Sequence, residues 1–153
     1  MGRDEFQHAQ YFEKMAQHRA AITCPSNFEY MVAKYLEIPW TGTVLIAPRI
    51  SAEEIELVGF DHAINVMWAK DGADVLGNIG YVNSPGDNGS TMSAAGAELM
   101  KKSHTAHRRL DYVAHLVDRI KQGPFVPEDA KDIFLKHRQG EIGGRLAGNV
   151  PSE

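Results

Sequence analysis

Histidine and aspartate residues recur on one side of a predicted helix near residue 110. His107, Asp111 and His115 follow one another at intervals of four, so on a helix they lie on successive turns of one face. Imidazole and carboxylate groups are ligands of zinc, manganese and iron. The spacing therefore predicts a divalent metal site, to which His104, one turn earlier, could add a ligand.

This metal hypothesis needs a further ligand, because one helix cannot enclose an ion alone. The side chains available elsewhere are His8, His18, Asp61 and His62. The alternative is that the polar stripe is the solvated face of an amphipathic helix, on which Asp111 pairs with its neighbouring histidines. Both interpretations stay open, since the spacing matches no zinc-protease, zinc-finger or deaminase signature.

Positive charge on the same helix suggests an anionic ligand. Arg108 and Arg109 flank the stripe, and residues 101–153 carry 10 Lys and Arg against 7 Asp and Glu, whereas residues 1–100 carry 6 against 13. A bound metal would activate water. One hypothesis is therefore a metal-dependent hydrolase acting on a phosphate-containing small molecule or nucleotide. The net charge of −4 argues against nucleic acid as a partner.

Catalytic motifs are otherwise missing from the sequence. No Rossmann, P-loop, kinase or hydrolase pattern is present, and Cys24 has no nucleophile signature around it. The tail 140–153 contains four glycines, so we expect a second copy or another protein to hold it. These features favour a non-enzymatic binding, assembly or regulatory protein that acts through protein–protein contacts, as a homo-oligomer or in a complex.

The predicted fold is helix-rich α+β, with one globular domain over residues 1–139. Helix and strand patterns, capping boxes at Ser26–Glu29 and Ser51–Glu54, and an Asp71-Gly72 turn set the elements. The expected order is helix 4–20, helix 26–37 ended by Pro39, strand 43–47, short helix 52–58, a β-hairpin 63–69/74–82, long helix 91–122 and helix 127–138. Residues 55–58 could equally form a strand.

The long helix should pack through an apolar stripe opposite the histidines. Leu99, Leu110, Val117 and Ile120 recur at helical spacing on that side. If the stripe is core, Leu110→Ala should cost roughly 2–5 kcal/mol.

Composition bears on the compartment. A single cysteine cannot form an internal disulfide, the first residues do not resemble a signal peptide, and no apolar run approaches the length of a membrane span. We therefore expect a soluble cytoplasmic protein without a membrane partner.

Overall fold

The structure, a computed structural model, describes the backbone of residues 3–25 and 30–142 and side chains from residue 9 within those ranges. Residue contacts divide the chain into two compact units, Met1–Lys101 and Lys102–Glu153. The division falls inside a helix. The predicted capping box at Ser26, and the Gly-rich tail from residue 143, lie outside the described residues.

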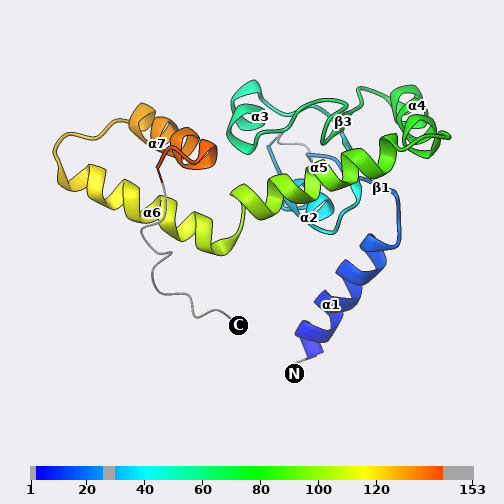
Figure 1. Cartoon of the computed structure of the whole chain (residues 1–153), viewed down its shortest axis with the longest axis horizontal. Helices are drawn as coiled ribbons and strands as arrows, with labels where there is room; N and C mark the ends of the chain where they lie inside the picture. The colour runs from blue at the N-terminus through cyan, green and yellow to red at the C-terminus, as the bar shows by residue number, and fades with distance from the viewer. Residues whose placement is uncertain (1–2, 26–29, 143–153) are drawn as a thin grey trace. The chain divides into compact units, whose positions relative to one another are not determined.

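Unit 1 is built on a three-stranded parallel sheet. The strands β1 (Ala20–Ile22), β2 (Val44–Ala47) and β3 (Met67–Trp68) lie in the order β1-β2-β3. Parallel strands need long crossover connections. Two helices, α2 (Lys34–Trp40) and α3 (Ala52–Val58), supply these connections (Figure 1).

The central strand β2 is buried on both faces. Leu45 and Ala47 belong to one hydrophobic cluster, while Val44 and Ile46 belong to the other. Because side chains alternate along a strand, this division places one cluster on each face of the sheet. An uninterrupted apolar run is typical of such a strand, and the predicted strand at 43–47 is confirmed.

The short helix α3 begins and ends as its sequence predicts. The Ser51 hydroxyl accepts the N–H of Glu54 at 3.1 Å, and the Glu54 carboxylate accepts the N–H of Ser51. Gly59 ends the helix in the left-handed conformation, with φ of 88°. The same carboxylate accepts the N–H of Met31, and this bond, ahead of the Ser51 hydroxyl, lowers the pKa of Glu54.

The predicted β-hairpin is wrong. Its second strand is the helix α4 (Gly72–Asn83), and β3 pairs in parallel with β2. Asp71 caps the helix by accepting the N–H of Asp74 at 2.9 Å. Asp-Gly suits a helix start as well as a hairpin turn, and Val75, Ile79 and Val82 fit helical spacing too.

Further boundaries differ from the prediction. The first helix, α1 (Arg3–Ala16), stops short of β1, a strand that the sequence did not predict. Helix α2 begins only at Lys34, whereas residues 30–33 were predicted to be helical, and it continues through Pro39 to Trp40 instead of ending before the proline. The helix-rich class with a small sheet is nevertheless confirmed. Within the described ranges, no helix combines the length and apolarity needed to cross a bilayer.

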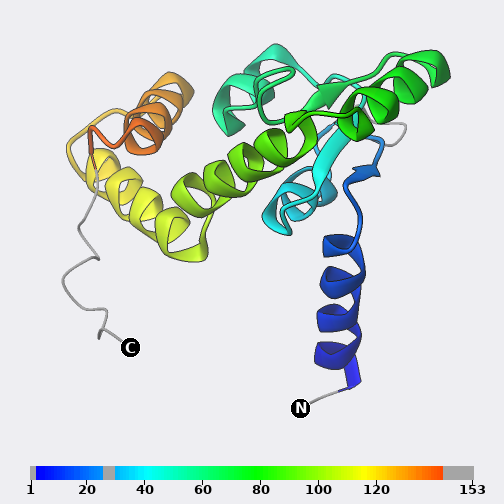
Figure 2. The same cartoon turned by 45° about the vertical axis from the view of Figure 1, so that its right-hand side comes forward.

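The predicted long helix is two helices, α5 (Asn88–Ser103) and α6 (Ala106–Lys121). Thr105 interrupts it and caps α6 by accepting the N–H of Arg108 at 3.1 Å. In unit 2, α6 packs beside α7 (Pro127–Gln139), and both views show the two helices side by side (Figure 2). The helix expected at 127–138 is therefore confirmed.

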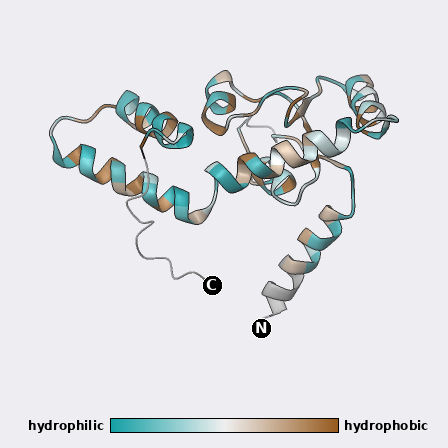
Figure 3. Ribbon diagram, in the orientation of Figure 1, coloured by the Kyte–Doolittle hydropathy of each residue, from teal (hydrophilic) through white to brown (hydrophobic). Residues whose placement is uncertain are grey.

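The face of α6 that packs against α7 is the polar one. Asp111 is 1% exposed, whereas Leu110 is 61% exposed, and Val113, Val117 and Ile120 are exposed with it. Hydrophobic and hydrophilic residues alternate along this helix (Figure 3). The predicted burial of Leu110, Val117 and Ile120 is wrong, because the amphipathic pattern does not say which face meets a neighbour. Leu99, on α5, is packed against the unit 1 core as expected.

The exposure of Leu110 changes the expected outcome of its substitution. Leu110→Ala should alter the free energy of unfolding by no more than about 0.5 kcal/mol, because the side chain loses little packing. Leu99→Ala is the matched comparison and should cost clearly more. Urea unfolding of both variants measures the difference, and equal losses would show that Leu110 is covered in solution.

Candidate functional site

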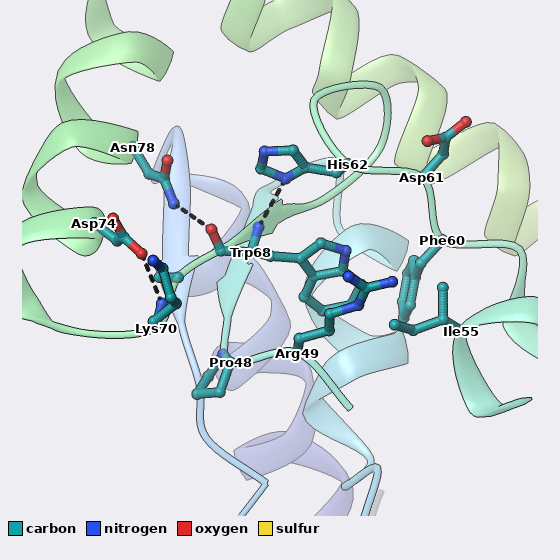
Figure 4. A pocket seen from close by; sticks show the side chains of 11 residues that line it. Pro48, Arg49, Ile55, Phe60, Asp61, His62, Trp68, Lys70, Asp74 and Asn78 are labelled. Atoms are coloured by element: carbon teal, nitrogen blue, oxygen red, sulfur yellow. Dashed lines mark hydrogen bonds between the residues drawn. The ribbon is translucent and has the colours of Figure 1, made fainter. Parts of the chain in front are cut away.

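A pocket of about 880 Å³ lies at the carboxyl ends of β2 and β3 (Figure 4). Pro48 and Arg49, which follow β2, line it together with Ala69 and Lys70, which follow β3. Parallel strands place these ends at one edge of the sheet, where ligands of open sheets with helical crossovers bind. Its volume is in the usual range of small-molecule sites.

An aromatic pair forms one side of the pocket. The rings of Phe60 and Trp68 meet edge to face, with centroids 5.9 Å apart and planes at 83°. Trp68 is half-buried and Phe60 is buried, so part of the indole remains accessible. An accessible indole can stack on a nucleobase or pack against the C–H face of a sugar.

Two pocket side chains fix the backbone of Trp68. Strand β3 lies at the edge of the sheet, so the Trp68 N–H and C=O that face away from β2 have no strand partner. His62 Nδ1 accepts this N–H at 3.1 Å, and Asn78 Nδ2 donates to this carbonyl at 3.0 Å. These bonds satisfy the backbone N–H and C=O of Trp68 at the edge of the sheet, and they hold the indole in place.

The loop that carries His62 is held by the buried side chain of Asn65. Its Oδ1 accepts the N–H of Asp61 at 2.8 Å, and its Nδ2 donates to the Gly59 carbonyl at 3.2 Å. Ala63 takes a left-handed conformation, with φ of 60°, and donates to the Val66 carbonyl at 2.9 Å. A non-glycine residue in this region is strained, and such strain clusters at functional sites.

The pocket also brings together groups of both charges. Arg49 and Lys70 contribute positive charge, while the Asp74 carboxylate accepts the Lys70 N–H at 3.0 Å. The Asp61 carboxylate points away from the other labelled side chains (Figure 4). An aromatic wall beside an arginine and a lysine suits a ligand with a planar ring and a phosphate group.

A family model described as glycosyl transferase-like matches residues 2–115, about three quarters of the chain. The chain belongs to this family. No curated protein and no solved structure matches the chain. The matched range contains every residue that lines the pocket. Membership of the family suggests an enzyme and supports neither the assembly nor the metal-hydrolase hypothesis.

The predicted metal residues are placed differently from one another. Asp111 is buried against α7, where its Oδ2 accepts a hydrogen bond from His137 Nε2 at 2.9 Å. His115 is half-buried, with its ring centroid 6.2 Å from that of His137, whereas His107 is exposed. No group of three or more His, Cys, Asp or Glu side chains in the described part of the chain is arranged to hold a metal ion.

The remaining predicted residues are spread over the chain. Arg109 is exposed, Arg108 is half-buried on α6, and His104 lies between α5 and α6. Among the proposed further ligands, His62 and Asp61 belong to the pocket, and His18 is exposed on the segment before β1. The side chain of His8 lies outside the described residues. Cys24 is a free, exposed thiol.

Sequence reasoning missed Arg49, Trp68 and Lys70. Arg49 could have been found, because it follows the correctly predicted strand 43–47 and residues after parallel strands commonly bind ligands. Trp68 and Lys70 were missed because the predicted hairpin paired the strand at 63–69 with residues 74–82 and not with β2.

Proposed function

We propose that this protein acts in glycosyl transfer and binds a nucleotide-activated sugar in the pocket at the carboxyl ends of β2 and β3. The observation that carries the proposal is the family match over the whole pocket. We thus assign the phosphate-containing ligand to Arg49 and Lys70 in unit 1, and no longer to Arg108 and Arg109 beside the α6 histidines. Transfer to an acceptor replaces hydrolysis as the reaction.

The pocket offers a partner for each part of such a donor. Trp68, braced by Phe60, provides a face for the nucleobase or the sugar. Arg49 and Lys70 provide cations for the two phosphates, and an arginine fork matches phosphate oxygens in a bidentate manner. The buried backbone contacts of Asn65 keep the loop next to this wall in one conformation before the ligand arrives.

Glycosyl transfer uses positive charge on the leaving group. An oxygen of the acceptor forms a bond to the anomeric carbon, and the bond from that carbon to the diphosphate breaks. The diphosphate leaves with the electron pair, so negative charge grows on the oxygen that joined it to the anomeric carbon. The proton of the acceptor hydroxyl passes to a base. Arg49 and Lys70 would stabilise the growing charge, which is the kind of interaction that lowers a barrier.

Nucleotide binding to the full chain tests the proposal. The sequence has two tryptophans, Trp40 and Trp68, so Trp40→Phe leaves Trp68 as the sole indole reporter. We expect UDP, GDP or ADP to change its fluorescence saturably. Arg49→Ala should weaken that binding about 10- to 100-fold, because a charge-assisted hydrogen bond contributes about 1.5–3 kcal/mol.

Arg109→Ala is the matched control, since Arg109 is an exposed arginine on α6. It should leave the affinity within a factor of two. If none of the three nucleotides binds at millimolar concentration, the proposal is wrong. A loss with Arg109→Ala but not with Arg49→Ala would instead move the anion site to the α6 arginines, as the sequence first predicted.

A further inference from the structure

The His62 ring has one nitrogen engaged in the fold. The Trp68 N–H donates to Nδ1 at 3.1 Å, and a nitrogen that accepts a hydrogen bond must present its lone pair. A neutral imidazole carries one proton, so this bond places the proton on Nε2. The contact that holds Trp68 in place therefore also decides the tautomer of His62.

The other nitrogen is available to a ligand. His62 is exposed and lines the pocket, and its Nδ1 faces the Trp68 backbone, while the rest of the ring extends away from that bond (Figure 4). The two nitrogens of an imidazole point in different directions. The ring therefore turns an N–H donor, and not a basic lone pair, away from the protein backbone.

The neighbouring groups indicate what that donor would meet. Arg49 and Lys70 line the same pocket and favour an anion, whereas the Asp61 carboxylate next to His62 points away. A neutral N–H donor in the same pocket adds a directed hydrogen bond to a phosphate oxygen without adding charge.

We infer that His62 binds the diphosphate of the nucleotide through its Nε2–H while its Nδ1 positions Trp68. This inference rests on the proposed function of the pocket. It makes His62 a phosphate-binding residue and excludes it as the general base in its neutral form, because its only lone pair is occupied by the Trp68 N–H. Asn78 has the positioning role only, because its Nδ2 donates to the Trp68 carbonyl.

Comparison of a nucleoside with its diphosphate separates the two roles. With Trp40→Phe as background, His62→Gln should keep most of the affinity for UDP, since its amide can accept from Trp68 and donate to phosphate. His62→Leu should weaken UDP binding about tenfold more than uridine binding. Asn78→Ala is the matched control and should weaken both ligands by the same factor. The same pair of measurements with GDP and guanosine applies if GDP is the nucleotide bound.

Nitrogen NMR of the histidine rings provides a readout that needs no nucleotide. In the neutral ring, the His62 signals should show a protonated Nε2 and an unprotonated Nδ1. A proton on Nδ1, or an equal loss of nucleoside and diphosphate affinity in His62→Leu, overturns the inference while leaving the proposed function intact. Wild-type protein that binds no nucleotide overturns the proposed function and the phosphate role with it, whatever the tautomer.

Discussion

Replacing Asp111 with alanine should destabilise the α6–α7 pair by about 1–3 kcal/mol, because it removes the acceptor of a buried hydrogen bond. Asp111 is 1% exposed and His137 is 4% exposed, and their side chains are joined at 2.9 Å. Without the carboxylate, the buried imidazole N–H loses its acceptor and cannot reach water. A buried donor without a partner costs its full desolvation energy.

His115, whose ring centroid lies 6.2 Å from that of His137, adds a further buried polar atom beside this pair. Nε2 of His115 is also buried, and it makes no hydrogen bond to any described residue. A second ion pair between α6 and α7 joins Arg119 to Asp129 at 2.9 Å, and both of its side chains are partly exposed. Exposed pairs contribute little. Asp111 and His137 therefore provide a buried polar contact between α6 and α7.

Hydrogen exchange of the α6 and α7 amides measures this prediction. Protection in Asp111→Ala should fall by roughly one to two orders of magnitude, since 1.4 kcal/mol corresponds to a factor of ten. Asp132→Ala is the matched control, because Asp132 pairs with Lys136 on the surface of α7. Its protection should barely change. Equal protection in the two variants would mean that the buried pair does not hold the helices together.

This part of the chain illustrates what periodicity can and cannot predict. The His107–Asp111–His115 spacing correctly predicts that the polar residues share one side of a helix. It does not predict that the side packs against α7, because the partner, His137, is 26 residues further along the chain. A polar stripe and an apolar stripe are equally regular, and only the tertiary structure shows that Asp111 is buried and Leu110 exposed.

Some local signals agree with the structure, although the Asp71-Gly72 turn and the stop at Pro39 do not. The capping box at Ser51–Glu54, the left-handed Gly59 and the apolar run of β2 all depend on neighbours in sequence, and each is confirmed. The three-residue β1 and the two-residue β3 are too short to carry a pattern of their own. The sequence did not predict β1. It did predict a strand at 63–69, which contains β3, but not the parallel pairing of β3 with β2.

The candidate site was harder to predict than the fold because strand ends create it. Trp68 and His62 become site residues through a single backbone contact, which exists because β3 is an edge strand. No spacing rule links a histidine to a tryptophan six residues later. Arg49 needed only the position of β2 and the rule that parallel strands bind ligands at their carboxyl ends.

The buried hydroxyl of Tyr35 should make the stability of unit 1 depend on alkaline pH. Tyr35 is 0% exposed on α2, and its hydroxyl donates to the Pro48 carbonyl at 2.9 Å, beside the pocket. Burial, with smaller contributions from Cys24 and Glu54, raises the pKa of Tyr35 to about 12. An unfolded tyrosine has an ordinary pKa of about 10.

The sign of the effect follows from the direction of that shift. The folded state holds the Tyr35 proton more tightly than the unfolded state, so the stabilisation is fully present below a pH of about 10 and is lost as pH rises through about 12. At neutral pH, Tyr35→Phe should cost about 1–2 kcal/mol, because the Pro48 carbonyl loses its donor. Phenylalanine does not ionise, so the variant escapes the alkaline loss.

Urea unfolding at a series of pH values measures both effects in one comparison. The advantage of the wild type over Tyr35→Phe should shrink above a pH of about 10 and reverse as it nears 12, a total change of roughly 2–3 kcal/mol for a two-unit shift. Tyr81→Phe is the control, because Tyr81 is exposed on α4. Its difference from wild type should vary far less with pH. A gap for Tyr35→Phe that stays constant across this range would mean that the hydroxyl is accessible to water in solution, and the closed packing of α2 against the pocket segment at Pro48 would then be wrong.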